Sequence, residues 1–136
     1  MQRHAAAFTL LEIIVVLFIA ALVIAVGAGA VAQLTADHEL RQVANEAEIT
    51  LMQAMTRTVA TAQPQQVNLA ELARKARLSV RRVGVDEFVP AEGQRLYLRP
   101  GGLCEPLTLR WQTGTAWISA TLDPLTGAFA ETEEQL

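Results

Sequence analysis

The chain is poor in the residues that carry most enzymatic and metal chemistry. Its 136 residues include one cysteine, Cys104, and two histidines, and its only serines are Ser79 and Ser119. A single cysteine cannot close an internal disulfide, and no C-x-x-C, histidine-rich or G-x-x-x-x-G-K pattern occurs. We therefore expect no catalytic residue, no metal ion and no cofactor. We interpret Cys104 as a small, half-buried apolar side chain, the alternative being a reactive thiol.

Formal charge is almost missing from the N-terminal third. Between Arg3 and Asp37 the only charged residue is Glu12, and the run from Ile13 to Leu34 is uncharged. About 22 helical residues extend about 33 Å, enough to cross a hydrocarbon core of about 30 Å. A carboxylate in such a segment is costly and marks function by default. The sequence therefore predicts one membrane-spanning helix with a functional acid near its start.

The residues before this span are arranged unlike an ordinary secretory signal. In such a signal a small-residue cleavage site follows the apolar core, which is lost on processing. Here a polar start and the small residues at 5–7 come before the apolar run, so the hydrophobic helix would be retained. The segment Phe8-Thr9-Leu10-Leu11-Glu12 resembles the class III signal of type IV pilins and type II secretion pseudopilins.

This resemblance implies a processing site and an assembly site. A prepilin peptidase would cut between Ala7 and Phe8 and would methylate the new N-terminal amine of Phe8. Glu12 would then pair with the N-terminal amine of an adjacent subunit. Within one chain, its partner would be the amine of Phe8, four residues back on the same helical face. The alternative is that Glu12 lies near the headgroups and reaches water.

Three departures from the pilin pattern favour a minor pilin or a pseudopilin. Ala7 replaces the usual Gly before the cut, and Gly29 stands where many major pilins have a proline. Cys104 has no second cysteine with which to form the C-terminal pair of many major pilins.

Charges around the span predict its orientation. Arg3 and His4 precede it, whereas Asp37, His38 and Glu39 follow it. The positive-inside rule leaves the leader in the cytoplasm and exports the C-terminal part. We expect a single-pass protein of the inner membrane whose C-terminal head lies in the periplasm.

An apolar stripe continues the helix beyond the span at steps of three and four residues. Its members are Leu40, Val43, Ala44, Ala47, Leu51, Ala54, Met55 and Val59. Pro64 supplies a stop, so the pattern predicts one helix from Phe8 to about Ala60, roughly 80 Å long. Gly27 and Gly29 weaken it, either for close packing against a neighbouring membrane helix or for local melting in a filament.

After Pro64 the sequence indicates a short helix and then strands. Asn68 or Gln66 would cap a helix through Leu69, Leu72 and Ala76. Alternation predicts strands at 78–83, 95–99, 107–111 and 116–122 and a last short one at 128–129. The predicted class is α+β, with a long N-terminal helix packed on a small antiparallel β-sheet head, as in pilins. Its parts are a leader at 1–7, a membrane and filament-core helix at 8–34, an amphipathic continuation at 35–62, and a head at 63–136.

The head resembles the minor pseudopilin GspH and the related minor pilin FimT. The resemblance rests on the segments 96–102, 106–109 and 123–127. It implies a subunit of a type II secretion pseudopilus or a type IV pilus. The implied partners are prepilin peptidase, other pilins or pseudopilins through the N-terminal helix, the inner-membrane assembly platform and the lipid bilayer.

Two other functions stay open. A basic cluster could capture DNA, as in a FimT-like minor pilin; its members are Arg74, Lys75, Arg77, Arg81 and Arg82. The net charge of −3 and the flanking acids favour a solvated face or a salt-bridged contact with a neighbouring pilin, so we do not expect nucleic acid as a partner. A plain single-pass membrane protein is the third interpretation.

Overall fold

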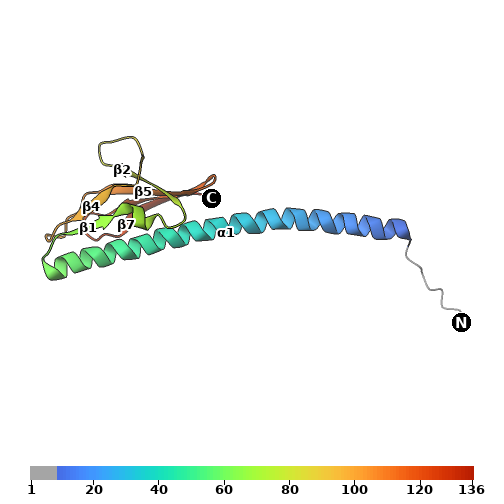
Figure 1. The fold of residues 1–136 in the computed structure, drawn as a ribbon, viewed down its shortest axis with the longest axis horizontal. Coiled ribbons are helices and arrows are strands. Elements are labelled where there is room, and N and C mark those ends of the chain that lie inside the picture. Colours follow the sequence, from blue (N-terminus) through green and yellow to red (C-terminus); the bar gives the residue numbers. More distant parts are fainter. Residues whose placement is uncertain (1–8) are drawn as a thin grey trace. The chain divides into compact units, whose positions relative to one another are not determined.

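The computed structural model describes residues 9–136, apart from the side chains of residues 32 and 33. The predicted cleavage residues Ala7 and Phe8 lie outside this range. The chain divides into two compact units between Thr35 and Ala36. Its elements are α1 (Leu10–Thr61), β1 (Gln65–Asn68), the 3-10 helix η1 (Leu69–Leu72), β2 (Arg77–Arg82), β3 (Val89–Pro90), β4 (Arg95–Leu98), β5 (Leu107–Thr113), β6 (Ala116–Leu122) and β7 (Phe129–Gln135) (Figure 1).

The predicted long helix is confirmed by α1, which has 52 residues. It stops at Thr61 because Ala62 adopts a positive φ of 53° and Pro64 follows shortly afterwards. A proline disfavours the helical conformation of the residue before it and cannot donate to a preceding carbonyl. Pro64 therefore explains why this helix ends where it does.

One stripe of α1 forms the helical side of the core in the second unit. Its buried members are Leu40, Ala44, Ala47, Leu51, Met55 and Thr58. Val59 was predicted to belong to this stripe, but its side chain is 53% exposed, whereas Thr58 is fully buried. The three- and four-residue spacing leads from Met55 to Thr58, and the Thr58 hydroxyl donates to the carbonyl of Ala54 at 2.8 Å. The hydroxyl is thereby satisfied inside the core.

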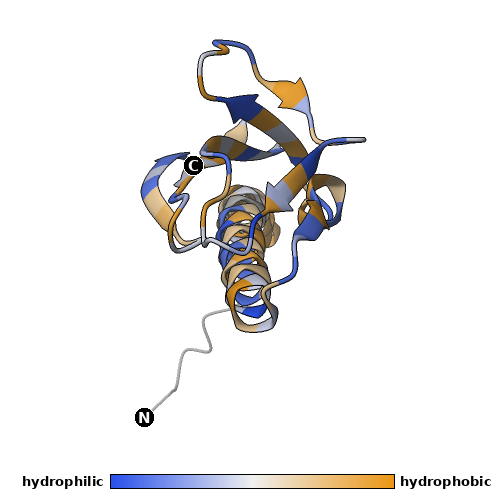
Figure 2. Cartoon of the chain, turned by 90° about the vertical axis from the view of Figure 1, so that its left-hand side faces the viewer, coloured by the Kyte–Doolittle hydropathy of each residue, from blue (hydrophilic) through white to orange (hydrophobic). Residues whose placement is uncertain are grey.

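The strands form two antiparallel sheets rather than one. β1 pairs with β4 in a two-stranded sheet, and the second sheet has the order β3-β2-β5-β6-β7. This confirms the α+β class, with the helix packed on antiparallel strands. Figure 2, viewed at right angles to Figure 1, shows the strands arching over the helix.

The segment between α1 and β4 differs most from the prediction. Asn68 does cap a short helix, since its side chain accepts from the Ala70 amide at 3.2 Å. That helix ends at Leu72 instead of reaching Ala76, and Arg74 adopts a positive φ of 51°. β1, β3 and most of β7 were not predicted, because each is an edge strand without apolar alternation.

Trp111 on β5 ties the sheet to the rest of the core. Its indole is fully buried, and its Nε1 donates to the carbonyl of Leu72 at 3.0 Å. The ring centroid of Phe129 on β7 lies 5.8 Å from that of Trp111, in a tilted arrangement. The indole therefore joins η1, the centre of the sheet and its last strand.

Gly127, in the turn before β7, has a positive φ of 75° and lies against α1. A Cβ atom there would be 3.2 Å from the Leu51 carbonyl oxygen. Gly114 also has a positive φ, but a Cβ atom there would meet nothing within 4 Å. A substitution at Gly114 would therefore add backbone strain alone, whereas one at Gly127 would add both backbone strain and steric overlap with α1.

We predict that Gly114→Ala lowers the free energy of unfolding by about 1–2 kcal/mol, the strain of a left-handed residue with a Cβ. Gly127→Ala should lower it by about 1–3 kcal/mol more, because the added methyl overpacks against helix backbone. Urea unfolding of the full chain in detergent micelles, followed by tryptophan fluorescence, measures both. Equal losses would show that α1 yields to the extra methyl.

Candidate processing and assembly site

The start of α1 is capped by Thr9. The Thr9 hydroxyl accepts a hydrogen bond from the Glu12 amide at 3.3 Å, and its carbonyl accepts the Ile13 amide at 3.3 Å. These two bonds define an N-cap, which satisfies one of the amide groups that a helix start leaves without a partner. Thr9 and Glu12 also have the spacing of a capping box. That spacing could have revealed the role of Thr9 from the sequence, where the motif drew attention only to Phe8 and Glu12.

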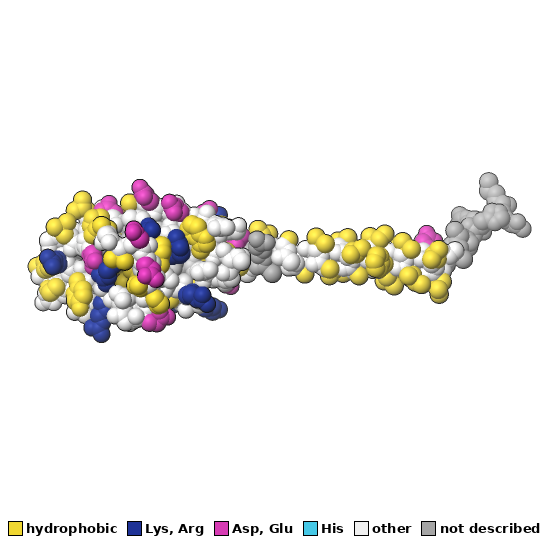
Figure 3. All heavy atoms as spheres, turned by 90° about the horizontal axis from the view of Figure 1, so that it is seen from above, with side chains coloured by type: hydrophobic (Ala, Val, Ile, Leu, Met, Phe, Trp, Pro, Cys, Tyr) yellow, Lys and Arg dark blue, Asp and Glu magenta, His cyan; other side chains and the backbone are white. Residues whose placement is uncertain are grey.

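Glu12 lies in the first turn of α1 and is exposed. Its carboxylate has no ion-pair partner among the described residues. The helix surface around it is apolar: the exposed side chains include Leu10, Leu11, Ile13, Val15 and Val16. Figure 3 shows this part of the helix as hydrophobic and white atoms with one acidic group near its start. The carboxylate is therefore available to a partner outside the described part of the chain.

Of the predicted site residues, the structure describes only Glu12, because Ala7 and Phe8 lie outside the described range. The pairing of Glu12 with the amine of Phe8 and the cut before Phe8 stay predictions. The described helix α1 begins at Leu10, on the C-terminal side of the predicted scissile bond.

Nothing in the described chain covers the apolar surface of the first unit. From Leu10 to Val31 and at Leu34, the side chains are exposed. By length and composition, α1 is able to cross a membrane. Exposed apolar surface is unfavourable in water by roughly 25 cal/mol per Å². This part of α1 therefore requires lipid or other apolar helices around it.

Comparison with protein families gives one finding. Residues 2–28 match the family model described as the prokaryotic N-terminal methylation motif. The match includes Ala7, Phe8 and Glu12. It indicates that the chain is a prepilin-like substrate of prepilin peptidase, with a single-pass anchor in the inner membrane and a pilin-type mode of assembly. No curated protein and no solved structure matches the chain.

The basic cluster is divided by its partners. Arg74 Nη2 lies 3.3 Å from Glu46 Oε2 on α1, and Arg82 forms an ion pair with Glu105. Arg81 stacks on the ring of Phe88, with its Cζ atom 4.8 Å from the ring centroid. The cluster is therefore no continuous row of free cations.

Arg110 completes an aromatic and cationic stack on the outer face of the sheet. Its Cζ atom lies 4.0 Å from the Phe88 ring centroid and 4.7 Å from that of Trp117. The buried Nε of Arg110 has no hydrogen-bond partner among the described residues. Stacking between two rings holds this guanidinium in place of an ion pair.

The described residues offer few groups that could act in catalysis or bind a metal ion. Among residues 9–136, no three His, Cys, Asp or Glu side chains lie together as a metal site would require. Cys104 is buried, and burial raises the pKa of its thiol, with the negative charge of Asp123 adding to the effect. The absence of a catalyst, a metal ion or a cofactor stays a prediction.

We predict that Thr9→Val increases the hydrogen-exchange rate of the Glu12 amide about fivefold, which corresponds to the loss of an N-cap worth about 1 kcal/mol. Thr9→Ser keeps the hydroxyl and is the matched control, with exchange close to that of the parent chain. NMR exchange measurements on the full chain in micelles distinguish the two. The same rate in both variants would refute the cap.

The Cys104 thiol should be nearly inert in the folded protein. A raised pKa leaves less thiolate than a free cysteine has at any pH below that value, and the thiolate is the nucleophile. At pH 8.5 we expect alkylation by iodoacetamide to be slower than in the urea-unfolded chain by about tenfold or more. Mass spectrometry over time follows the reaction, and equal rates would identify an accessible thiol.

Proposed function

We propose that this chain is a minor pseudopilin or minor pilin subunit of a type II secretion pseudopilus or a type IV pilus. The observation that carries the proposal is the methylation motif together with a capped apolar helix that the described chain does not cover. This helix bears one acid, Glu12, which has no ion-pair partner among residues 9–136. The subunit waits in the inner membrane, loses residues 1–7 and then enters a filament. Its apolar stem forms part of the filament core, and its head lies in the periplasm.

The acid gives this transfer a direction. The apolar side chains of the stem gain little on moving from lipid to a filament core, because both surroundings are apolar. A carboxylate in the membrane is unfavourable by at least about 2.5 kcal/mol, and an amine partner removes much of that penalty. Cleavage before Phe8 creates the amine, and the neighbouring subunit offers it to Glu12. An incoming subunit therefore gains this ion pair only next to a neighbour that has been processed.

Three segments support the GspH/FimT-like assignment of the head. These are 96–102, 106–109 and 123–127, and the first and the third both contact Cys104. Leu98 forms an isolated bridge with Cys104, whose amide donates to the carbonyl of Pro124 at 3.0 Å. The turn at 123–127 is closed by the Gly127 amide donating to Asp123 at 3.0 Å. The likeness itself rests on the sequence of these segments.

We also propose that the chain is not an enzyme and that nucleic acid is not its main partner. The chain has only two serines, Ser79 and Ser119, and two histidines, so few side chains could form a pair of nucleophile and base. Arg74 and Arg82 form ion pairs with Glu46 and Glu105, which makes the basic cluster a weaker phosphate-binding surface.

The first test measures the intact mass and the N-terminal residue of the protein expressed with and without prepilin peptidase. We expect a product starting at methylated Phe8 only when the peptidase is present. The second test uses the variant Glu12→Ala. This variant should insert into the membrane and be processed, but it should be absent from sheared filaments. Glu39→Ala, which removes an exposed acid beyond the span, is the matched control and should be incorporated normally. Normal incorporation of Glu12→Ala would refute the role of the acid.

A further inference from the structure

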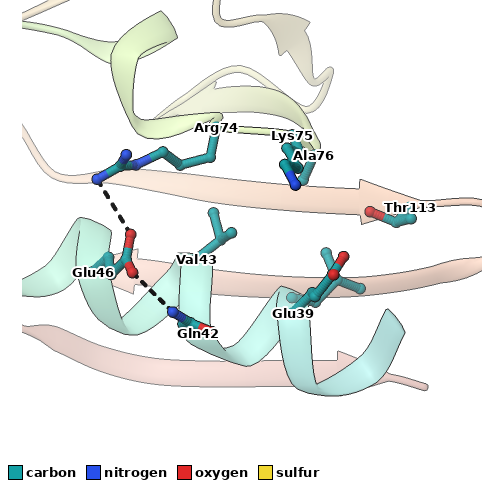
Figure 4. Close-up of a pocket in the computed structure, with 9 residues that line it drawn as sticks. Glu39, Gln42, Val43, Glu46, Arg74, Lys75, Ala76 and Thr113 are labelled. Atoms are coloured by element: carbon teal, nitrogen blue, oxygen red, sulfur yellow. Dashed lines mark hydrogen bonds and ion pairs between the residues drawn. The ribbon is translucent and has the colours of Figure 1, made fainter. Parts of the chain in front are cut away.

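Within residues 36–136, one side of α1 borders an open groove of about 420 Å³. The walls of this groove come from α1, from residues 74–76 and from the end of β5 (Figure 4). Leu40, which is buried, and Val43, which is half-buried, supply apolar surface to it. The charged residues of the lining are Glu39, Glu46, Arg74 and Lys75. The groove therefore combines apolar surface with charges of both signs.

The charges at one end of the groove are paired within the chain. Arg74 Nη2 lies 3.3 Å from Glu46 Oε2, and Gln42 Nε2 donates to Glu46 Oε1 at 3.1 Å. Both carboxylate oxygens of Glu46 thus have a partner, as the dashed lines in Figure 4 mark. A ligand at this end would have to replace contacts that are already made.

The other two charges of the groove have no such partners. Lys75, in the segment after η1, and Glu39, on α1, are exposed and lie on opposite walls (Figure 4). Neither has an ion-pair partner among residues 9–136. An acid and a base therefore line the same open space without forming a contact with each other. A ligand that carries a negative and a positive group close together would satisfy both.

The position of Glu39 in the chain indicates what such a ligand is. Glu39 follows Leu34, the last residue of the uncharged run, by five residues. Five residues of an α-helix rise about 7.5 Å, and even an extended chain reaches no more than about 18 Å. The headgroups form a layer of about 5–8 Å on each side of the hydrocarbon core. A span that ends at Leu34 therefore brings Glu39 next to the headgroups.

We propose that this groove binds the headgroup of a phospholipid that carries both a phosphate and a primary ammonium. The phosphate accepts hydrogen bonds from the Lys75 ammonium, and the lipid ammonium donates to the Glu39 carboxylate. Headgroups line both surfaces of a bilayer, so the contact needs only the membrane anchor and goes beyond the filament function. Because it is made in the membrane and not in a filament, Glu39→Ala is still expected to enter filaments normally.

The two charges also select among headgroups. A purely anionic headgroup meets Glu39 as well as Lys75, so attraction to one is offset by repulsion from the other. A trimethylated ammonium has no N–H group with which to donate to the carboxylate. Phosphatidylethanolamine should therefore bind better than phosphatidylglycerol or phosphatidylcholine.

Native mass spectrometry of the unprocessed full chain in dodecyl maltoside micelles tests this preference. The three phospholipids, with the same acyl chains, are added together in equal amounts, and the lipid retained by the protein is measured. We expect about threefold more retained phosphatidylethanolamine than either of the others, as one exposed ion pair would give. Equal retention of all three lipids by the parent chain would overturn the proposal.

Substitutions assign the two contacts. Lys75→Gln should lower the retention of all three lipids about threefold, whereas Lys75→Arg keeps the charge and should retain them. Glu39→Gln should lower phosphatidylethanolamine to the level of phosphatidylcholine. Arg57→Gln is a matched control, because Arg57 is exposed and lies about 27 Å beyond Glu39 along α1. It should leave the retention of every lipid unchanged.

The same spectra distinguish a lipid from other occupants. Phosphoethanolamine without acyl chains, at the concentration of the lipid, should not displace it, because the acyl chains concentrate the lipid in the micelle. Displacement would identify a soluble zwitterion as the occupant and overturn the lipid. If Lys75→Gln and Glu39→Gln change the proportion of dimers and leave lipid retention unchanged, a second copy occupies the groove and the proposal is wrong. None of these results depends on processing at Phe8 or on entry into filaments.

Discussion

An apolar helical surface that its own chain does not cover constrains every other feature of this protein. Between Leu10 and Leu34 the described side chains turn outward all round the helix, so no soluble monomer can hide them. Lipid satisfies that surface in one setting, and neighbouring stems of the same kind satisfy it in another. The head can then be small, because it does not have to shield the stem. The head then has to stabilise only the part of α1 that follows residue 36.

The head achieves this with a core built around one helix stripe and one indole. Trp111 fills the space between α1, η1 and β7, and its ring nitrogen is satisfied by a backbone carbonyl. Gly127 brings the last turn directly against the backbone of α1. Because the core takes up only one stripe of the helix, both flanks of α1 remain near the surface. The edge strand β7 is therefore placed by the same packing that stabilises the fold.

The sequence predicted those parts of the structure in which periodicity is strong. The span, the stop at Pro64 and the strand at 116–122 each carry a clear apolar pattern or a proline, and the structure has them where they were expected. The prediction for Val59 was wrong because Thr58, one residue earlier, points more directly toward the core. Its hydroxyl can also donate a hydrogen bond to the helix backbone. β7 was underestimated because Phe129 is its only strongly apolar residue, and its remaining side chains are exposed. Edge strands depend on their neighbours for pairing, and a single sequence does not contain that information. The site residues were predicted with similarly mixed success. Glu12 was predicted because of its charge, whereas the cap formed by Thr9 was missed because its spacing to Glu12 was not considered.

The cap at Thr9 also determines what kind of event processing can be. The hydrogen bonds that start α1 are made by Thr9, which lies on the retained side of the predicted scissile bond. If the cut falls there, Thr9 and both of these bonds remain in the shortened chain. Processing would then leave the cap in place and add one amine, at Phe8, four residues before the Glu12 carboxylate. On this basis maturation alters the charge next to a helix start whose cap is already formed.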